Sequence, residues 1–94
     1  MKERQIEKHL TLAVKAMGGL CPKWVSPGLD GVPDRIILLP GGRIAFAEIK
    51  SPGERPRRLQ EVCIARLRRL GFTVYVIDDS GQIPGILEKA GDTK

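Results

Sequence analysis

The turn at Pro40-Gly41-Gly42 most constrains the fold, because it joins two apolar segments that have the composition of strands. Residues 31–39 precede it and residues 43–50 follow it, so the sequence predicts an antiparallel hairpin. A loop of all three turn residues pairs Leu39 with Arg43. A loop of the two glycines alone would shift the register by one residue and, unless a bulge intervened, turn the paired side chains to opposite faces.

Charged residues gather at the open end of this hairpin when the loop has three residues. That register sets Asp34 opposite Glu48, and Lys50 follows on the same face. Opposed residues have Cβ atoms about 4.5–5.5 Å apart, so one hard cation could bridge the two carboxylates. Phe46 shares the face and indicates that it is directed at the core, whereas a solvent-facing strand end is the alternative for Glu48 and Lys50. Asp34 alone could instead be a turn residue after Pro33.

Amphipathic patterns predict helices on both sides of the hairpin. The first is expected over residues 3–17, where Gly18 ends it, and a short last helix is expected over 83–90. Another is expected over about 57–70, with its apolar face formed by Leu59, Cys63, Leu67 and Leu70.

Two further strands are expected beside the hairpin. Residues 20–26 form a first strand, and the continuous apolar run at 73–78 suits a buried position parallel to the 43–50 strand, reached by a right-handed helical crossover. The predicted fold class is therefore α/β, a small mixed sheet of order αβββαβ flanked by helices. Residues 1–94 are expected to form one domain.

The charge of the chain favours a polyanionic partner. Sixteen Lys and Arg against eleven Asp and Glu give a net charge of +5, which an ordinary basic protein could also carry. The distribution is more informative, because six arginines fall between positions 55 and 69. Five of them are predicted to contact DNA phosphates rather than form a merely solvated face, namely Arg55, Arg57, Arg58, Arg68 and Arg69.

Cysteine and histidine content excludes a zinc site of the usual ligand set. Cys21 and Cys63 have no CxxC spacing, and His9 is the only histidine. The two cysteines are therefore interpreted as buried reduced thiols. No apolar run approaches the length of a membrane span, so the protein is expected to be intracellular, in the cytoplasm, with no membrane partner.

Three short segments carry a family resemblance: Gly31-Val32-Pro33-Asp34, Ala47-Glu48-Ile49-Lys50 and Leu59-Gln60. With an early Glu in the first helix and this element order, they resemble the PD-(D/E)xK nuclease superfamily and, within it, the stand-alone virus-type replication-repair nuclease (VRR-NUC) domain. The resemblance extends over nearly the whole chain. It implies a restriction-endonuclease-like fold, Mg²⁺ or Mn²⁺ as cofactor, phosphodiester hydrolysis and a homodimer similar to Holliday-junction resolvases. A phage-encoded member would act in the host cell.

The resemblance also assigns roles to individual residues. Asp34, Glu48 and the main-chain carbonyl of Ile49 would hold the metal, which lowers the pKa of the attacking water and polarises the phosphoryl oxygen. Lys50 would orient that water or stabilise charge, and its neighbouring carboxylates favour the protonated form and the second role. Gln60 would hydrogen-bond the water or a phosphate oxygen, with an exposed helical glutamine as the alternative.

The acid on the first helix has two candidates, Glu3 and Glu7. Glu3 lies about 30° from the centre of the apolar stripe and Glu7 about 70° from it, so Glu3 points more directly at the sheet. The family pattern, a Glu three residues before the first apolar helix position, also falls on Glu3. Compensation of the helix dipole would place an acid here as well.

The sequence therefore predicts a metal-dependent, structure-specific DNA endonuclease that acts on branched or four-way (Holliday) junction DNA. The alternatives are a nicking or flap nuclease and a catalytically inactive nucleic-acid-binding module on the same fold. A homodimer is expected from the small core, open sheet edges and the loop over 27–33, where Leu29 and Val32 look exposed.

Overall fold

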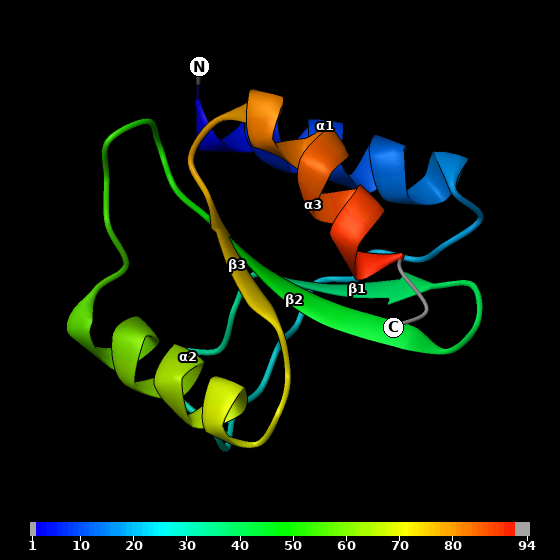
Figure 1. Cartoon of the computed structure of the whole chain (residues 1–94). Helices are drawn as coiled ribbons and strands as arrows, with labels where there is room; N and C mark the ends of the chain where they lie inside the picture. Colours follow the sequence, from blue (N-terminus) through cyan, green and yellow to red (C-terminus); the bar gives the residue numbers. More distant parts are fainter. Residues whose placement is uncertain (1, 92–94) are drawn as a thin grey trace.

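A three-stranded mixed sheet lies at the centre of the computed structural model, which describes residues 2–91. Its middle strand, β2 (Arg43–Ile49), runs antiparallel to β1 (Arg35–Leu39) and parallel to β3 (Val74–Ile77). Helices α1 (Glu3–Ala16) and α3 (Ile83–Ala90) cover one face of the sheet, and α2 (Arg58–Arg69) covers the other (Figure 1). A short 3-10 helix, η1 (Ser80–Gln82), leads into α3. The predicted α/β class and the parallel position of β3 are confirmed.

The hairpin has the register that the three-residue loop predicts. Leu39 pairs with Arg43, and Ile36 pairs with Phe46. Gly41 and Gly42 have positive φ angles of 85° and 76°, a conformation that side chains with a Cβ rarely adopt. The turn sequence thus sets the register, and the register brings Asp34 and Glu48 to the same end of the hairpin.

The strand expected over 20–26 is wrong as a continuous strand. The segment lies along β1 and forms two isolated bridges, Leu20 with Leu38 and Lys23 with Arg35. Pro22 accepts a hydrogen bond from the Ile36 N–H but has no N–H to return one, so the ladder is interrupted there. The observed order has two strands before α2, not three.

Two hydrophobic clusters lie on opposite faces of the sheet. The cluster under α1 and α3 is aliphatic and includes Ile6, Leu10, Ile37 and Ile77. The cluster under α2 is smaller and is built from Phe46, Cys63, Ile64, Leu67 and Val74. The Trp24 ring contacts Phe46 at a ring-centroid distance of 4.8 Å and an interplanar angle of 36°. Trp24 is thereby partly buried at the edge of this cluster, and of the two cysteines predicted to be buried only Cys63 is.

The apolar face predicted for α2 is rotated relative to the observed one. Leu59 and Leu70 are 62% and 73% exposed, whereas Gln60 and Ile64 are buried together with Cys63 and Leu67. The buried positions follow the helical spacing i, i+3, i+4 and i+7 from Gln60. A sequence pattern of apolar residues misses this stripe because its first member is polar, and Gln60 is buried because it has hydrogen-bond partners there.

The loop over 27–33 packs against α2. Leu29 and Val32, which look exposed in the sequence, are half-buried against the cluster under α2. Gly31 has a φ angle of +78°, and a Cβ at this position would lie 2.3 Å from the Leu59 carbonyl oxygen. Only glycine allows this approach, so the loop that leads into Asp34 is fixed against the first turn of α2.

Within residues 2–91, no helix combines the length and the apolar character needed to cross a membrane. Cys21 is half-buried and, like Cys63, forms no disulfide in the described chain. Burial raises the pKa of the Cys21 thiol to about 11.

Candidate active site

Glu48 is the centre of the candidate site. It lies near the end of the middle strand, it is 0% exposed, and its Oε2 atom has two partners. The Lys50 ammonium group lies 3.2 Å from this oxygen, and the Gln60 side-chain amide donates a hydrogen bond to it over 2.6 Å. A fully buried carboxylate in a strand end is therefore held by one cation and one neutral donor.

The second carboxylate oxygen of Glu48 is buried without a partner. Among residues 2–91, no group hydrogen-bonds Oε1. Burial, and next the negative charge of Asp34, raise the pKa of Glu48 to about 7, although Lys50 acts in the opposite direction. An unpaired oxygen of this kind is costly unless a further positive group satisfies it.

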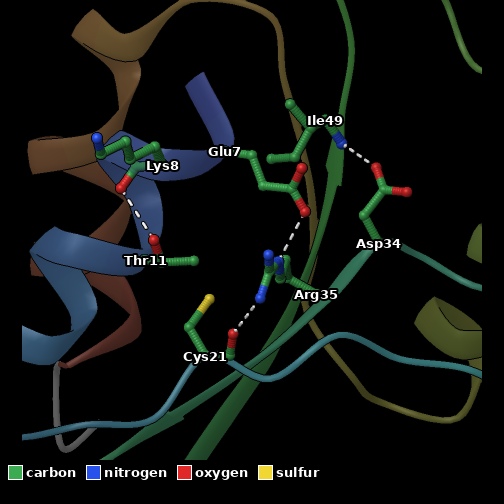
Figure 2. Close-up of polar contacts among 7 residues, drawn as sticks. All are labelled: Glu7, Lys8, Thr11, Cys21, Asp34, Arg35 and Ile49. Atoms are coloured by element: carbon green, nitrogen blue, oxygen red, sulfur yellow. Dashed lines mark hydrogen bonds and ion pairs between the residues drawn. The ribbon is translucent and has the colours of Figure 1, made fainter. Parts of the chain in front are cut away.

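Asp34 immediately precedes β1 and continues the hairpin register by one pair toward Glu48. Its Oδ2 atom accepts a hydrogen bond of 2.8 Å from the Ile49 N–H, as Figure 2 shows. Its main-chain carbonyl accepts from the Trp24 N–H. Burial raises the pKa of Asp34, against the lowering effect of the Ile49 N–H. Asp34 is thus a positioned carboxylate at the site and not simply a turn residue after Pro33.

Gln60 links this site to the first turn of α2. Its side-chain oxygen accepts from the Arg57 N–H at 2.8 Å, and its amide donates to Glu48. It is 9% exposed, so the alternative of an exposed helical glutamine is wrong. Both ends of the side chain are occupied by protein, which makes Gln60 a support for Glu48.

The two acids of α1 have different partners. Glu7 forms an ion pair of 2.7 Å with Arg35, whose guanidinium group also donates to the Cys21 carbonyl (Figure 2). Glu3 is exposed and accepts a long hydrogen bond of 3.4 Å from the hydroxyl of Ser51, the residue that follows Lys50. The ion pair of Glu7 therefore joins α1 to β1, while Glu3 contacts the loop that follows β2.

The arginines fall into two groups along α2. Arg57 and Arg58 are exposed at its first turn, next to Gln60, and Arg55 is exposed in the preceding loop. Arg68 and Arg69 lie at the other end of the helix, about 12 Å along the axis from Gln60 at 1.5 Å per residue. Arg68 donates a hydrogen bond of 2.6 Å to the Val74 carbonyl, so part of its donor capacity serves the sheet.

The donors at the site suit a hard cation. In residues 2–91, no three side chains of His, Cys, Asp and Glu come together as a metal-binding group. The metal ligands predicted from the sequence include two such side chains, Asp34 and Glu48, and the third ligand is the main-chain carbonyl of Ile49. Carboxylate and carbonyl oxygens are the ligands that Mg²⁺ and Mn²⁺ prefer, and the unpartnered Glu48 Oε1 lacks only a positive partner.

Sequence reasoning missed two positioning residues. Arg35 has the pattern of an ordinary residue at the start of a strand, and its partly buried ion pair with Glu7 depends on the packing of α1 on β1, which no local pattern contains. Gly31 belongs to a motif, but its contact with the Leu59 carbonyl requires the packing of α2, which no local pattern contains.

Comparison with known proteins places this geometry in context. No protein-family model matches the sequence. The chain is 50% identical over 78 residues to a protein of Acyrthosiphon pisum secondary endosymbiont phage 1 named "Putative nuclease p44", and the match covers 83% of this chain and 84% of the relative. A solved structure described as "VRR_NUC domain" superposes with a TM-score of 0.87 at 31% sequence identity, over 94% of this chain and 96% of that one.

Proposed function

This chain belongs to the VRR-NUC family of nucleases, and on that premise we propose that it is a metal-dependent endonuclease that cleaves branched DNA. The single observation that carries the proposal is the state of Glu48. Its carboxylate is fully buried, held at one oxygen by Lys50 and Gln60, and unpartnered at the other. A structural ion pair needs no such open oxygen, whereas a metal ligand does.

The residues present fit Mg²⁺ or Mn²⁺, which Asp34, Glu48 and the Ile49 carbonyl would hold. When bound, the ion supplies positive charge beside the scissile phosphate and lowers the pKa of the attacking water. The protein holds the two carboxylates in place before the substrate arrives, through the Ile49 N–H on Asp34 and the Gln60 amide on Glu48. This preorganisation means that little reorganisation accompanies the reaction.

Lys50 supplies the positive charge of the protein itself at the site. Its ammonium group is fixed 3.2 Å from Glu48 Oε2 and largely shielded from solvent. In this position it stabilises the negative charge that develops on the phosphoryl oxygens in the transition state. Glu3 of α1 accepts a hydrogen bond from the Ser51 hydroxyl and would orient the attacking water, whereas Glu7 is paired with Arg35.

Arginines at the first turn of α2 would bind the DNA backbone. Arg57 and Arg58 are exposed beside Gln60, so phosphates next to the scissile one come within their reach. Arg55 in the preceding loop extends this surface, and Arg68 and Arg69 would contact the backbone farther along the same strand.

A homodimer that cuts two strands of a four-way junction remains part of the proposal. Its support is the exposed apolar surface of α2 outside its first turn, where Val62 and Leu70 are 45% and 73% exposed, and not the loop that holds Leu29 and Val32. A two-fold arrangement would place two identical sites on one particle.

Cleavage of a panel of DNAs tests the proposed function. Linear, nicked, flapped and four-way substrates are incubated with the protein in Mn²⁺, and products are mapped to the nucleotide. Paired cuts near the branch point of the four-way DNA are expected. Cleavage only of the nicked or flapped DNA would assign the nicking or flap activity, and binding without turnover would assign an inactive binding module.

A further inference from the structure

A cleft opens next to the candidate active site, between the loop over 26–32 and the first turn of α2. Its volume is about 570 Å³, within the range of pockets that hold small organic groups. Gln60 forms part of its lining, and the same side chain donates to Glu48. The cleft is therefore one side chain away from the proposed cleavage centre.

The walls of the cleft combine two chemistries. Leu29, Val32 and Leu59 give it an apolar interior. Leu59, in the first turn of α2, is 62% exposed. Arg57 and Arg58 line the cleft at the start of α2 and carry positive charge. Asp30 lines it from the loop, and its carboxylate can accept hydrogen bonds. A phosphate alone would make no favourable contact with the aliphatic walls. A flat, apolar group with amino substituents, attached to a phosphate, matches both parts.

The shape of the cleft is fixed by the backbone. Gly31 lies against the Leu59 carbonyl so closely that no Cβ could be added, and Leu29 and Val32 are anchored in the cluster under α2. The cleft is thus preformed rather than a gap between mobile side chains, which lowers the entropic cost of binding.

From these observations we infer that the cleft receives the base of an unpaired nucleotide adjacent to the scissile phosphate, with Arg57 and Arg58 on its phosphates. A base within a duplex cannot enter without being unstacked and unpaired, and that cost is smallest where the base is already unpaired. The cleft therefore selects DNA that has an unpaired nucleotide at the cleavage point, as flapped and bulged structures do. This inference rests on the proposed function and specifies its substrate.

Binding of three DNAs tests the inference. They are a duplex with a single-nucleotide bulge of 2-aminopurine, the same duplex with an abasic nucleotide in the bulge, and the fully paired duplex. Ca²⁺ replaces Mn²⁺ so that binding is measured without cleavage. The abasic DNA retains the backbone charge and the local flexibility, and it lacks only the base.

The protein should bind the 2-aminopurine bulge about tenfold more tightly than the abasic bulge, and the fluorescence of 2-aminopurine should rise as the base leaves its stacked neighbours for an aliphatic cleft. Leu59→Ser should remove both effects. Leu12→Ser is the control, because Leu12 is an exposed leucine on α1, outside both the cleft and the proposed dimer surface, and it should change neither. Both substitutions are at exposed positions, so folding is retained.

The inference would be overturned by equal affinity for the base and abasic bulges, or by a Leu59→Ser variant that keeps the preference. Cleavage in Mn²⁺ separates this result from the proposed function. Efficient cleavage without any preference for the base would reject the cleft and keep the nuclease. Selective binding of the base without cleavage of any DNA would keep the cleft and reject the nuclease.

Discussion

The Gln60 side-chain amide lies 2.6 Å from Glu48 Oε2 while its oxygen accepts from the Arg57 N–H, so one side chain joins the helix start to the buried acid. Gln60→Ala should therefore lower cleavage by about 10–100-fold and raise the Mn²⁺ concentration needed for half-maximal activity, as loss of a ligand-orienting partner does. Metal titrations of the cleavage rate measure this shift.

Gln82 provides the control for that substitution. Its side-chain oxygen accepts from the Asp78 and Asp79 N–H groups, so it also caps a helical segment, away from the site. Gln82→Ala should lower the melting temperature and leave the metal dependence unchanged. Equal metal dependence in Gln60→Ala and the unmodified protein would limit Gln60 to helix capping.

Gly31→Ala should destabilise the fold and reduce cleavage, because the new Cβ would lie 2.3 Å from the Leu59 carbonyl oxygen. Gly42→Ala is the matched control, since Gly42 has a similar φ of +76° and a Cβ added there would have nothing within 4 Å. Strain from positive φ alone costs about 1–2 kcal/mol, and both variants share it. Thermal unfolding should show an additional loss for Gly31→Ala, and similar melting temperatures for the two variants would contradict the close contact.

The fold was predictable wherever local chemistry determined it. The Pro40-Gly41-Gly42 turn sets the pairing of Leu39 with Arg43, and this register alone brings Asp34 and Glu48 together. The stripe of α2 was not predictable from apolar spacing, because burial of Gln60 depends on a glutamate in a strand twelve residues earlier. Leu29 and Val32 likewise become half-buried only through the packing of α2 on the loop, a tertiary contact with no local signal.

Replacing Arg57 and Arg58 together with Ala should weaken binding to every DNA in the panel and flatten the plot of log affinity against log salt by up to about two contacts of slope. Both side chains are exposed, so stability should be retained. An unchanged salt slope, measured by fluorescence anisotropy, would assign the pair to a solvated surface.

Arg68→Ala should behave differently from that double variant, because its guanidinium group donates to the Val74 carbonyl at 2.6 Å. Loss of a hydrogen bond from a charged donor should lower the free energy of unfolding by about 1–2 kcal/mol. Chemical denaturation measures this change, with Arg69→Ala as the control, for which no loss of stability is expected. Equal stability of the two variants would show that Arg68 does not serve the sheet.

Light scattering at micromolar concentration should give about twice the 10.3 kDa chain mass if α2 forms a two-fold interface. Val62→Lys, at a position that is 45% exposed and outside the cleft, should shift the mass toward the monomer. A monomeric protein that still makes paired, symmetric cuts in a four-way junction would remove the need for a dimer.

Cleavage by Glu48→Gln tests the central claim most directly, because glutamine keeps the size of the side chain and removes the charge from the unpartnered oxygen. The unmodified protein should cut branched DNA in Mn²⁺ and not in EDTA. Glu48→Gln, with an unchanged circular dichroism spectrum, should be slower by at least about 10²–10³-fold in Mn²⁺. Normal turnover by Glu48→Gln, or cleavage by the unmodified protein in EDTA, would contradict a metal-dependent site at Glu48.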